Sequence, residues 1–275
     1  TIDSDRSSVV FATPQFFIKA LTDGVLNSPT HVVFDEAHHL AAPTYSKLWG
    51  QATGSSDKIR MAIGLTATPS RTTRTSFESL LDLAANTLFL AESLLPDPVR
   101  VLQQRGVLSS PQCELLPSVP GYLSQEKIQK HQAEYHPDLW SSILEEVQTR
   151  PKTKTIIYMP TLNSASLLAD FLTHSGFSAD FLSGSHSADQ RIRTLERFRD
   201  SKSSILVNVN LLLEGVDMPD AERVIVPYTP TNILLNQMVG RVIRGSAVGG
   251  SDFAKVCVAD NVALAMAKAI NLSHT

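Results

Sequence analysis

Residues Val32–Leu40 read VVFDEAHHL, an apolar run that ends directly in two carboxylates and two histidines. The first three residues are continuously apolar, which is typical of a short strand buried in a parallel sheet. The charges begin at the carboxyl end of that strand, and this is where open parallel sheets bind their ligands. The stretch therefore predicts a parallel-sheet fold with a functional site at Asp35 and Glu36.

Composition bounds the class of protein. The chain has 275 residues, of which 43% are apolar and 19% charged, so it is long enough for two globular domains. Its formal net charge of −3 means that any contact with nucleic acid must use a local basic surface. Cys113 and Cys257 lie far apart in apolar surroundings, which indicates buried thiols in a reducing compartment. We find no apolar run of membrane length and no signal peptide, and we expect a cytoplasmic protein.

Strand-like apolar runs alternate with helical patterns along the chain, the clearest at Ser164–His174 and Asp189–Phe198. This alternation predicts an α/β fold, in which helices cover parallel sheets. The strand candidates are Val9–Ala12, His31–Phe34, Arg60–Leu65, Thr87–Leu90, Thr155–Tyr158, Ala179–Leu182, Ile205–Asn208, Arg223–Val226 and Ala254–Val258.

Prolines gather between Ser93 and Pro120, which is typical of a segment that runs between two sheets. We therefore predict a first domain over residues 1–92 and a second over residues 93–275.

The acidic pair shares its predicted sheet edge with Thr66–Thr68, which follow the strand candidate Arg60–Leu65. Adjacent carboxylates at such an edge can divide the chemistry of phosphoryl transfer. One faces a hydrated magnesium ion, and the other orients the attacking water. The alternative is a helix start, where the helix dipole favours acidic residues.

Two other kinds of metal site fit part of the same stretch. A zinc site could use His31, His38 and His39, but no convincing further ligand accompanies them. A metal-dependent nuclease could use Asp35 and Glu36, but no further acidic cluster completes a two-metal site. Both remain weaker interpretations than phosphoryl transfer.

The second half of the chain carries a pair of arginines in NQMVGRVIRG, Asn236–Gly245. Arg241 and Arg244 are three residues apart, so they lie on one side of a helix if this segment is helical. Two guanidinium groups held in that way could reach a phosphate as arginine fingers. The alternative is a solvated basic face, but Gln237, Gly240 and the apolar remainder favour the phosphate site.

Six stretches, taken in chain order, resemble the motifs of superfamily 2 helicases and translocases. Their amino-acid sequences look most like the motifs of the branch that holds RadD-type and XPB-like motors and type III restriction motor subunits. The resemblance runs from about Val9 to Val258 and implies two RecA-like parallel-sheet domains, the first truncated at its N-terminus. The stretches are ATPQ (Ala12–Gln15), DEAH (Asp35–His38), TAT (Thr66–Thr68), IIYMPTLNSASLLADFL (Ile156–Leu172), VNVNLLLEGVDMP (Val207–Pro219) and QMVGRVIR (Gln237–Arg244).

The resemblance implies ATP and Mg²⁺ as cofactors, with ATP hydrolysed in the cleft between the two domains. Asp35 would contact Mg²⁺ through water, and Glu36 would be the catalytic base. Arg241 and Arg244 would reach the γ-phosphate, with Gln237 nearby. The other implied residues are His38, Gly215 and Asp217 for the nucleotide, Thr66 and Thr68 for coupling, and Thr13, Gln15, Gly184, Asn208 and Asn210 for the nucleic-acid backbone.

A motor of this family also needs a phosphate cradle, Gly-x-x-x-x-Gly-Lys-Ser/Thr. None of the 13 glycines is followed by lysine. In the family the cradle precedes the ATPQ motif, so we expect a P-loop segment supplied in cis or in trans. We expect the chain alone to be inactive.

The function implied is that of an ATP-dependent nucleic-acid translocase or helicase, on DNA because the most similar motif spellings belong to DNA motors. Nuclease or defence-complex subunits are further partners that this branch allows. The alternative is a non-catalytic helicase-like scaffold that binds nucleic acid or a partner protein. The retained acidic and arginine residues favour the motor, since a scaffold has no need of them.

Overall fold

The computed structural model describes residues 9–23, 30–37, 40, 45–46, 49–50, 60–66, 92–95, 97–121, 123, 127–200, 204–209, 218 and 220–271. The chain divides into two compact units, Thr1–Phe89 and Leu90–Thr275. Each unit has its own parallel sheet. The α/β class predicted from the sequence is therefore confirmed.

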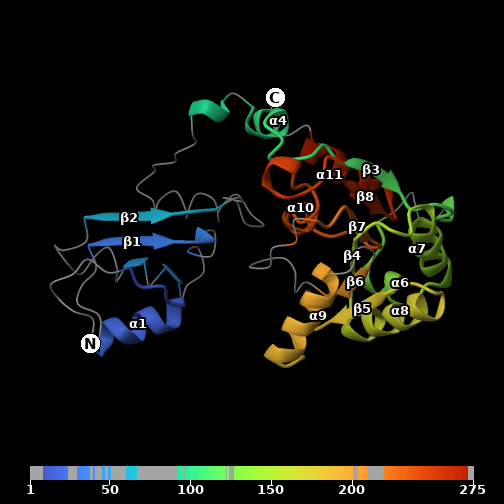
Figure 1. The fold of residues 1–275 in the computed structure, drawn as a ribbon, viewed down its shortest axis with the longest axis horizontal. Helices are drawn as coiled ribbons and strands as arrows, with labels where there is room; N and C mark the ends of the chain where they lie inside the picture. Colours follow the sequence, from blue (N-terminus) through green and yellow to red (C-terminus); the bar gives the residue numbers. More distant parts are fainter. Residues whose placement is uncertain are drawn as a thin grey trace. The chain divides into compact units, whose positions relative to one another are not determined.

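The described part of the first unit includes a two-stranded parallel sheet and the helix α1 (Figure 1). Phe34, at the end of the first strand, lies opposite Gly64 at the end of the second. Both strands were predicted as apolar runs, and both are confirmed. The elements are α1 (Pro14–Thr22), β1 (His31–Phe34) and β2 (Met61–Gly64).

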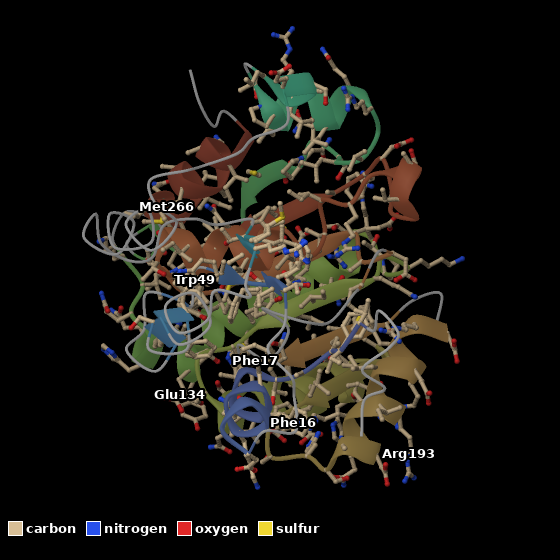
Figure 2. The ribbon with its side chains drawn as sticks, turned by 90° about the vertical axis from the view of Figure 1, so that its left-hand side faces the viewer. Phe16, Phe17, Trp49, Glu134, Arg193 and Met266 are labelled. Atoms are coloured by element: carbon tan, nitrogen blue, oxygen red, sulfur yellow. The ribbon has the colours of Figure 1, made fainter. Side chains whose placement is uncertain are left out.

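Aromatic rings form the core of this small sheet. The centroid of the Phe34 ring lies 5.1 Å from that of Trp49 and 6.4 Å from that of Phe17 on α1. Figure 2 labels Phe17 and Trp49. Buried Ala37 and Leu40 join the same cluster. The opposite face of β1 is not buried, because Val33 remains 60% exposed. The continuous apolar run is therefore covered on one face only.

The second unit contains a six-stranded sheet in the order β3-β8-β7-β4-β6-β5, with every pair parallel. Figure 1 shows β3 and β8 at one end of this sheet and β5 at the other. All four residues of β4, β6 and β7 are buried, as continuous apolar strands require. The strands are β3 (Gln112–Leu115), β4 (Thr155–Tyr158), β5 (Ala179–Leu182), β6 (Ile205–Asn208), β7 (Arg223–Val226) and β8 (Lys255–Val258).

Two long helices of this unit begin at short polar residues that act as caps. Thr161 accepts a hydrogen bond from the amide of Ser164 at 3.2 Å and starts α8, and Ser187 accepts one from Gln190 at 3.2 Å just before α9. The predicted helical stretches lie within these two helices and are confirmed. The helices are η2 (Glu92–Leu94), α4 (Pro98–Gln104), α6 (Lys130–Glu134), α7 (Pro137–Thr149), α8 (Leu162–His174), α9 (Ala188–Asp200), α10 (Asn232–Val239), η3 (Ser246–Val248) and α11 (Asn261–Asn271).

A buried ionic network ties α7 to the amino ends of β4, β7 and β8. Arg223 is fully buried, and its guanidinium donates to both the carbonyl and the carboxylate of Glu146, at 2.8 and 3.1 Å. It also donates to the hydroxyl of Thr155 at 2.9 Å. Lys255 reaches the same carboxylate at 2.9 Å. This network therefore stabilises the sheet edge opposite to the carboxyl ends of the strands.

Two strand predictions have other outcomes. Val9–Ala12 form no strand, and Phe11 in this segment is 94% exposed. The prediction was wrong because apolar character alone does not supply a neighbouring strand to pair with. Thr87–Leu90 lie outside the described residues. Among the helices that the structure describes, none has the length and apolar character needed to span a membrane.

Candidate functional site

Asp35 and Glu36 form the turn directly after β1. The amide of Leu65 donates to the carbonyl of the last β1 residue, and the amide of Ala37 donates in turn to the carbonyl of Leu65, both at 2.8 Å. These two bonds join the acidic turn to the segment that follows β2. Thr66 therefore lies at the same sheet edge as the acidic pair, as the sequence predicted.

Close packing fixes the path of this turn. A Cβ atom added to Gly64 would lie 2.7 Å from the Cβ of Ala37, which is shorter than a normal contact. Ala37 itself is 3% exposed. Glycine before the LTAT sequence and alanine within DEAH are thus required by the close approach of the two segments.

The two carboxylates have different surroundings. Asp35 is exposed, and its Oδ1 accepts a hydrogen bond from the amide of Glu36 at 2.9 Å. Glu36 is half-buried and has a φ of 51°, in the left-handed region that non-glycine residues rarely adopt. Such backbone strain gathers at functional sites, where the surroundings impose it. The arrangement suits two carboxylates with separate tasks.

Thr13 caps α1. Its hydroxyl accepts from the amide of Phe16 at 3.3 Å, and its carbonyl accepts from the amide of Phe17 at 2.9 Å. Gln15 is exposed in the first turn of the same helix. Thr13 therefore has a structural task, and the contact of both residues with nucleic acid stays a prediction.

Two residues predicted to contact nucleic acid lie at or just after strand ends of the second unit, and their exposure to solvent differs. Gly184 is exposed in the loop after β5. Asn208, at the end of β6, is fully buried, and its side-chain amide donates to the carbonyl of Ile157 at 3.2 Å. The position of Asn208 thus does not support a side-chain contact with a nucleic-acid backbone. Its observed role is to join β6 to β4.

The arginine pair is not carried by one helix. α10 ends at Val239 with Gly240 as its C-cap, and Arg241 lies in a tighter turn, where its amide donates to the carbonyl of Met238 at 3.2 Å. Arg244 lies further on and pairs with Leu108 in an isolated antiparallel bridge. The helical face considered from the spacing is therefore wrong, and half-buried Gln237 is the one member of the trio on α10.

Tyr158, at the carboxyl end of β4, is a neighbour of Arg241 that the sequence analysis did not single out. Burial raises the pKa of Tyr158 well above its ordinary value, and the positive charge of Arg241 partly opposes that rise. Tyr158 is the last residue of β4, so this electrostatic interaction acts at the carboxyl edge of the second sheet.

Asp260 is a second residue that the sequence analysis missed. It is fully buried directly before α11, where its Oδ1 accepts from the amide of Ala263 at 2.7 Å and its Oδ2 from the hydroxyl of Thr229 at 2.6 Å. It thereby joins the loop after β7 to the start of α11. Aspartate just before a helical pattern was the available signal, because it is a preferred N-cap.

Five of the predicted site residues lie outside the described residues: His38, Thr68, Asn210, Gly215 and Asp217. Within the described residues, no group of three or more His, Cys, Asp or Glu side chains could hold a metal ion. His31 lies at the amino end of β1, opposite to the acidic turn, and its Nδ1 is 2.9 Å from the hydroxyl of Thr30.

The donor chemistry at the acidic turn fits a magnesium ion held through water. An exposed carboxylate such as that of Asp35 is the oxygen ligand that Mg²⁺ prefers, and Mg²⁺ commonly keeps several of its own waters. When bound with a nucleotide, the ion would neutralise charge on the phosphates. Glu36 beside it could then orient a water or accept its proton.

Comparison with known proteins agrees with this geometry. The family model "Helicase conserved C-terminal domain" matches residues 138–246, and "Type III restriction enzyme, res subunit" matches residues 1–71. The chain is 25% identical over 233 residues to "Putative helicase 22" of Sulfolobus islandicus filamentous virus, covering 78% of the chain and 40% of that protein. It is 21% identical over 253 residues to "Putative ATP-dependent helicase IRC3" of Saccharomyces cerevisiae, covering 88% and 36%.

A solved structure shares the fold. The chain matches S. cerevisiae Dbp5 bound to RNA and ADP BeF3 with a TM-score of 0.61 and 15% identity, covering 94% of the chain and 61% of Dbp5. The parallel sheets define the fold, and the two family models, which match successive parts of the chain, support a superfamily 2 helicase or translocase. The restriction-subunit model and the two Irc3 relatives support the branch of type III restriction subunits and Irc3 within this superfamily. The chain spans 40% or less of the length of the two relatives named above.

Proposed function

We propose that this chain forms part of an ATP-dependent motor that translocates along nucleic acid, with DNA as its substrate. The observation that carries the proposal is the acidic turn after β1, where Asp35 and strained Glu36 are joined to the segment of Thr66. The matches to two helicase family models support a helicase-like motor. The amino-acid sequences of the motifs support DNA as the substrate.

In this proposal residues 1–92 and 93–275 each contribute one wall of the ATP site. Asp35 holds Mg²⁺ through water, and Glu36 activates the attacking water. Arg241 and Arg244 bind the γ-phosphate, with Gln237 beside them. The phosphate cradle comes from a P-loop segment in cis or in trans, because none of the 13 glycines precedes a lysine.

The nucleic acid would be held by its sugar-phosphate backbone, which allows steps along any sequence. Exposed residues at the strand ends and helix starts support this, namely Thr13, Gln15 and Gly184. Opening and closing of the two domains with each ATP would drive the steps, and Thr66 and Thr68 would couple the two events.

The decisive experiment uses Glu36→Gln in the full-length protein. ATP turnover should be abolished, while the Kd for a non-hydrolysable ATP analogue changes little, because the amide keeps the shape but cannot accept a proton. Unchanged turnover would remove Glu36 from the mechanism. Stimulation of the wild-type ATPase by single-stranded DNA and by RNA of equal length then decides the substrate.

A non-catalytic scaffold is the second candidate, favoured by the missing Gly-Lys sequence. It predicts no specific ATP binding even in the full-length protein. Measured binding of Mg·ATP to that protein by calorimetry separates the two candidates, since the motor requires binding and the scaffold does not.

A further inference from the structure

Arg244 is held by a partner segment from far away in the sequence. The residue pairs with Leu108 in an antiparallel bridge, and backbone bonds flank this pair on both sides. The flanking bonds are Ser109 N to Ile243 O at 2.8 Å, Gly245 N to Val107 O at 2.9 Å and Ala247 N to Gly106 O at 3.0 Å. Residues Gly106–Ser109 thus form a short strand-like brace along the arginine segment.

Glycines make this close pairing possible. A Cβ added to Gly245 would lie 2.0 Å from the carbonyl oxygen of Gly106, and one added to Gly250 would lie 2.0 Å from that of Arg244. Both contacts are with backbone atoms, which cannot rotate away as a side-chain end could. Gly106 has a φ of 67°, which glycine adopts without strain. The brace therefore tolerates no larger residue at Gly245 without moving.

The brace continues from the segment that follows the first unit, which ends at Phe89. Arg105 donates from Nη2 to the carbonyl of Ser93 at 3.0 Å. The amides of the two residues after Gly106 donate to the carbonyl of Leu102 on α4, at 2.9 and 3.2 Å. Hydrogen bonds therefore connect the start of the second unit to Arg244 without interruption.

We propose that residues Gly106–Ser109 are a positioning element for Arg244, through which the segment 92–105 sets the place of one phosphate-binding arginine. The inference rests on the proposed function, in which Arg244 reaches the γ-phosphate. Displacement of a reacting group by about 1 Å can cost on the order of 10² in rate, so fixing the backbone from which the Arg244 side chain extends has a catalytic effect. The backbone of Arg241 is held differently, in the turn after α10, where its amide donates to the carbonyl of Met238 at 3.2 Å.

The first test compares Gly245→Ala with Gly121→Ala in the full-length protein. A Cβ at Gly121 meets nothing within 4 Å, so this control adds the same methyl group in open space. Gly245→Ala should lower kcat for ATP by about tenfold or more with KM changed less than about threefold, and the control should match wild type. An unchanged kcat in a Gly245→Ala protein with wild-type melting would overturn the proposal.

Two milder variants at Gly106 allow the same proposal to be tested if Gly245→Ala does not fold. Gly106→Ala strains the backbone at positive φ but meets its nearest atom, the Cβ of Ala247, at an ordinary 3.5 Å. Gly106→Asn should restore much of the lost kcat, because asparagine tolerates positive φ better than alanine does. Equal activity of Gly106→Ala and wild type would contradict the brace.

A double-mutant cycle shows whether the effect passes through Arg244. Gly245→Ala added to Arg244→Ala should change kcat by less than about twofold, because the brace then has nothing to position. If the fold-loss of kcat in the double variant equals the product of the two single-variant losses, the proposal is overturned. If Glu36→Gln abolishes ATP turnover while Gly245→Ala does not lower it, the proposed motor function is supported and the proposed role of residues Gly106–Ser109 is contradicted. If Arg244→Ala keeps wild-type turnover, the proposed role of Arg244 fails, and the brace fails with it.

Discussion

The backbone amide of Ala37 donates a hydrogen bond to the carbonyl oxygen of Leu65 at 2.8 Å. This bond joins the DEAH turn to the residue before the TAT segment. Two motifs that are separate in the sequence thus share one sheet edge, and Gly64 allows the approach by lacking a Cβ.

We predict that Gly64→Ala lowers both stability and ATP turnover. The added methyl group would clash with Ala37, and overpacking of this kind costs about 1–3 kcal/mol in the free energy of unfolding. Denaturant unfolding and steady-state ATPase rates of the full-length protein measure the two effects. Gly50→Ala is the matched control, because a Cβ there meets nothing within 4 Å. Equal losses in both variants would contradict a specific role of the close contact.

Glu36→Gly should stabilise the protein while it abolishes ATP turnover. The left-handed conformation at φ 51° costs a non-glycine residue about 1–2 kcal/mol, and glycine removes most of that cost. Part of the gain is lost to the greater freedom of glycine in the unfolded chain, so we expect a net gain of about 0.5–1 kcal/mol. Thermal unfolding compares this variant with Glu36→Gln, which keeps the strain. A lower melting temperature for Glu36→Gly than for Glu36→Gln would contradict the prediction.

Arg241→Ala should reduce kcat for ATP by about 10³, the effect of removing an arginine finger in related phosphoryl-transfer enzymes. Binding of ATP should weaken much less, because the finger acts mainly on charge that develops in the transition state. Single-turnover hydrolysis and analogue binding separate these effects. A loss of kcat below tenfold would mean that Arg241 does not complete the site.

Glu146→Ala should destabilise the protein by about 3–5 kcal/mol, because it leaves buried Arg223 without its carboxylate. Its neighbour Glu145 is exposed, so Glu145→Ala should cost less than about 0.5 kcal/mol. Urea unfolding of the two variants makes the comparison. Similar midpoints would show that the buried network contributes little.

Stability should fall at high pH partly through Tyr228. Burial raises its pKa to about 12, above the ordinary value of 10.0. Between those values the unfolded chain has lost the phenol proton and the folded chain keeps it, so stability is present below pH 10 and declines by about 1.4 kcal/mol per pH unit above it. Tyr228→Phe should remove this part of the decline in unfolding experiments from pH 8 to 11.5. The same slope in both proteins would contradict the assignment.

Local patterns of apolar residues were sufficient to predict many of the strands and helices. The apolar runs of β4, β6 and β7 could be predicted because strands buried on both faces need continuous apolar residues. β3, QCEL, escaped prediction because it is a short edge strand whose exposed and half-buried residues alternate. The limits of α10 escaped it too, because Gly240 does not by itself say whether a helix continues through Arg241.

The sequence by itself determined the parallel α/β class, the acidic pair at the end of β1 and the family. These features follow from side-chain type and order along the chain. Only the tertiary structure decided that Asn208 is buried, that the charge of Arg241 acts on Tyr158 and that Leu108 pairs with Arg244. Contacts of this kind join residues far apart in the chain through backbone hydrogen bonds and burial. The periodicity of apolar residues does not identify such partners. It indicates which face of a helix or strand is apolar, and not which other element will cover that face.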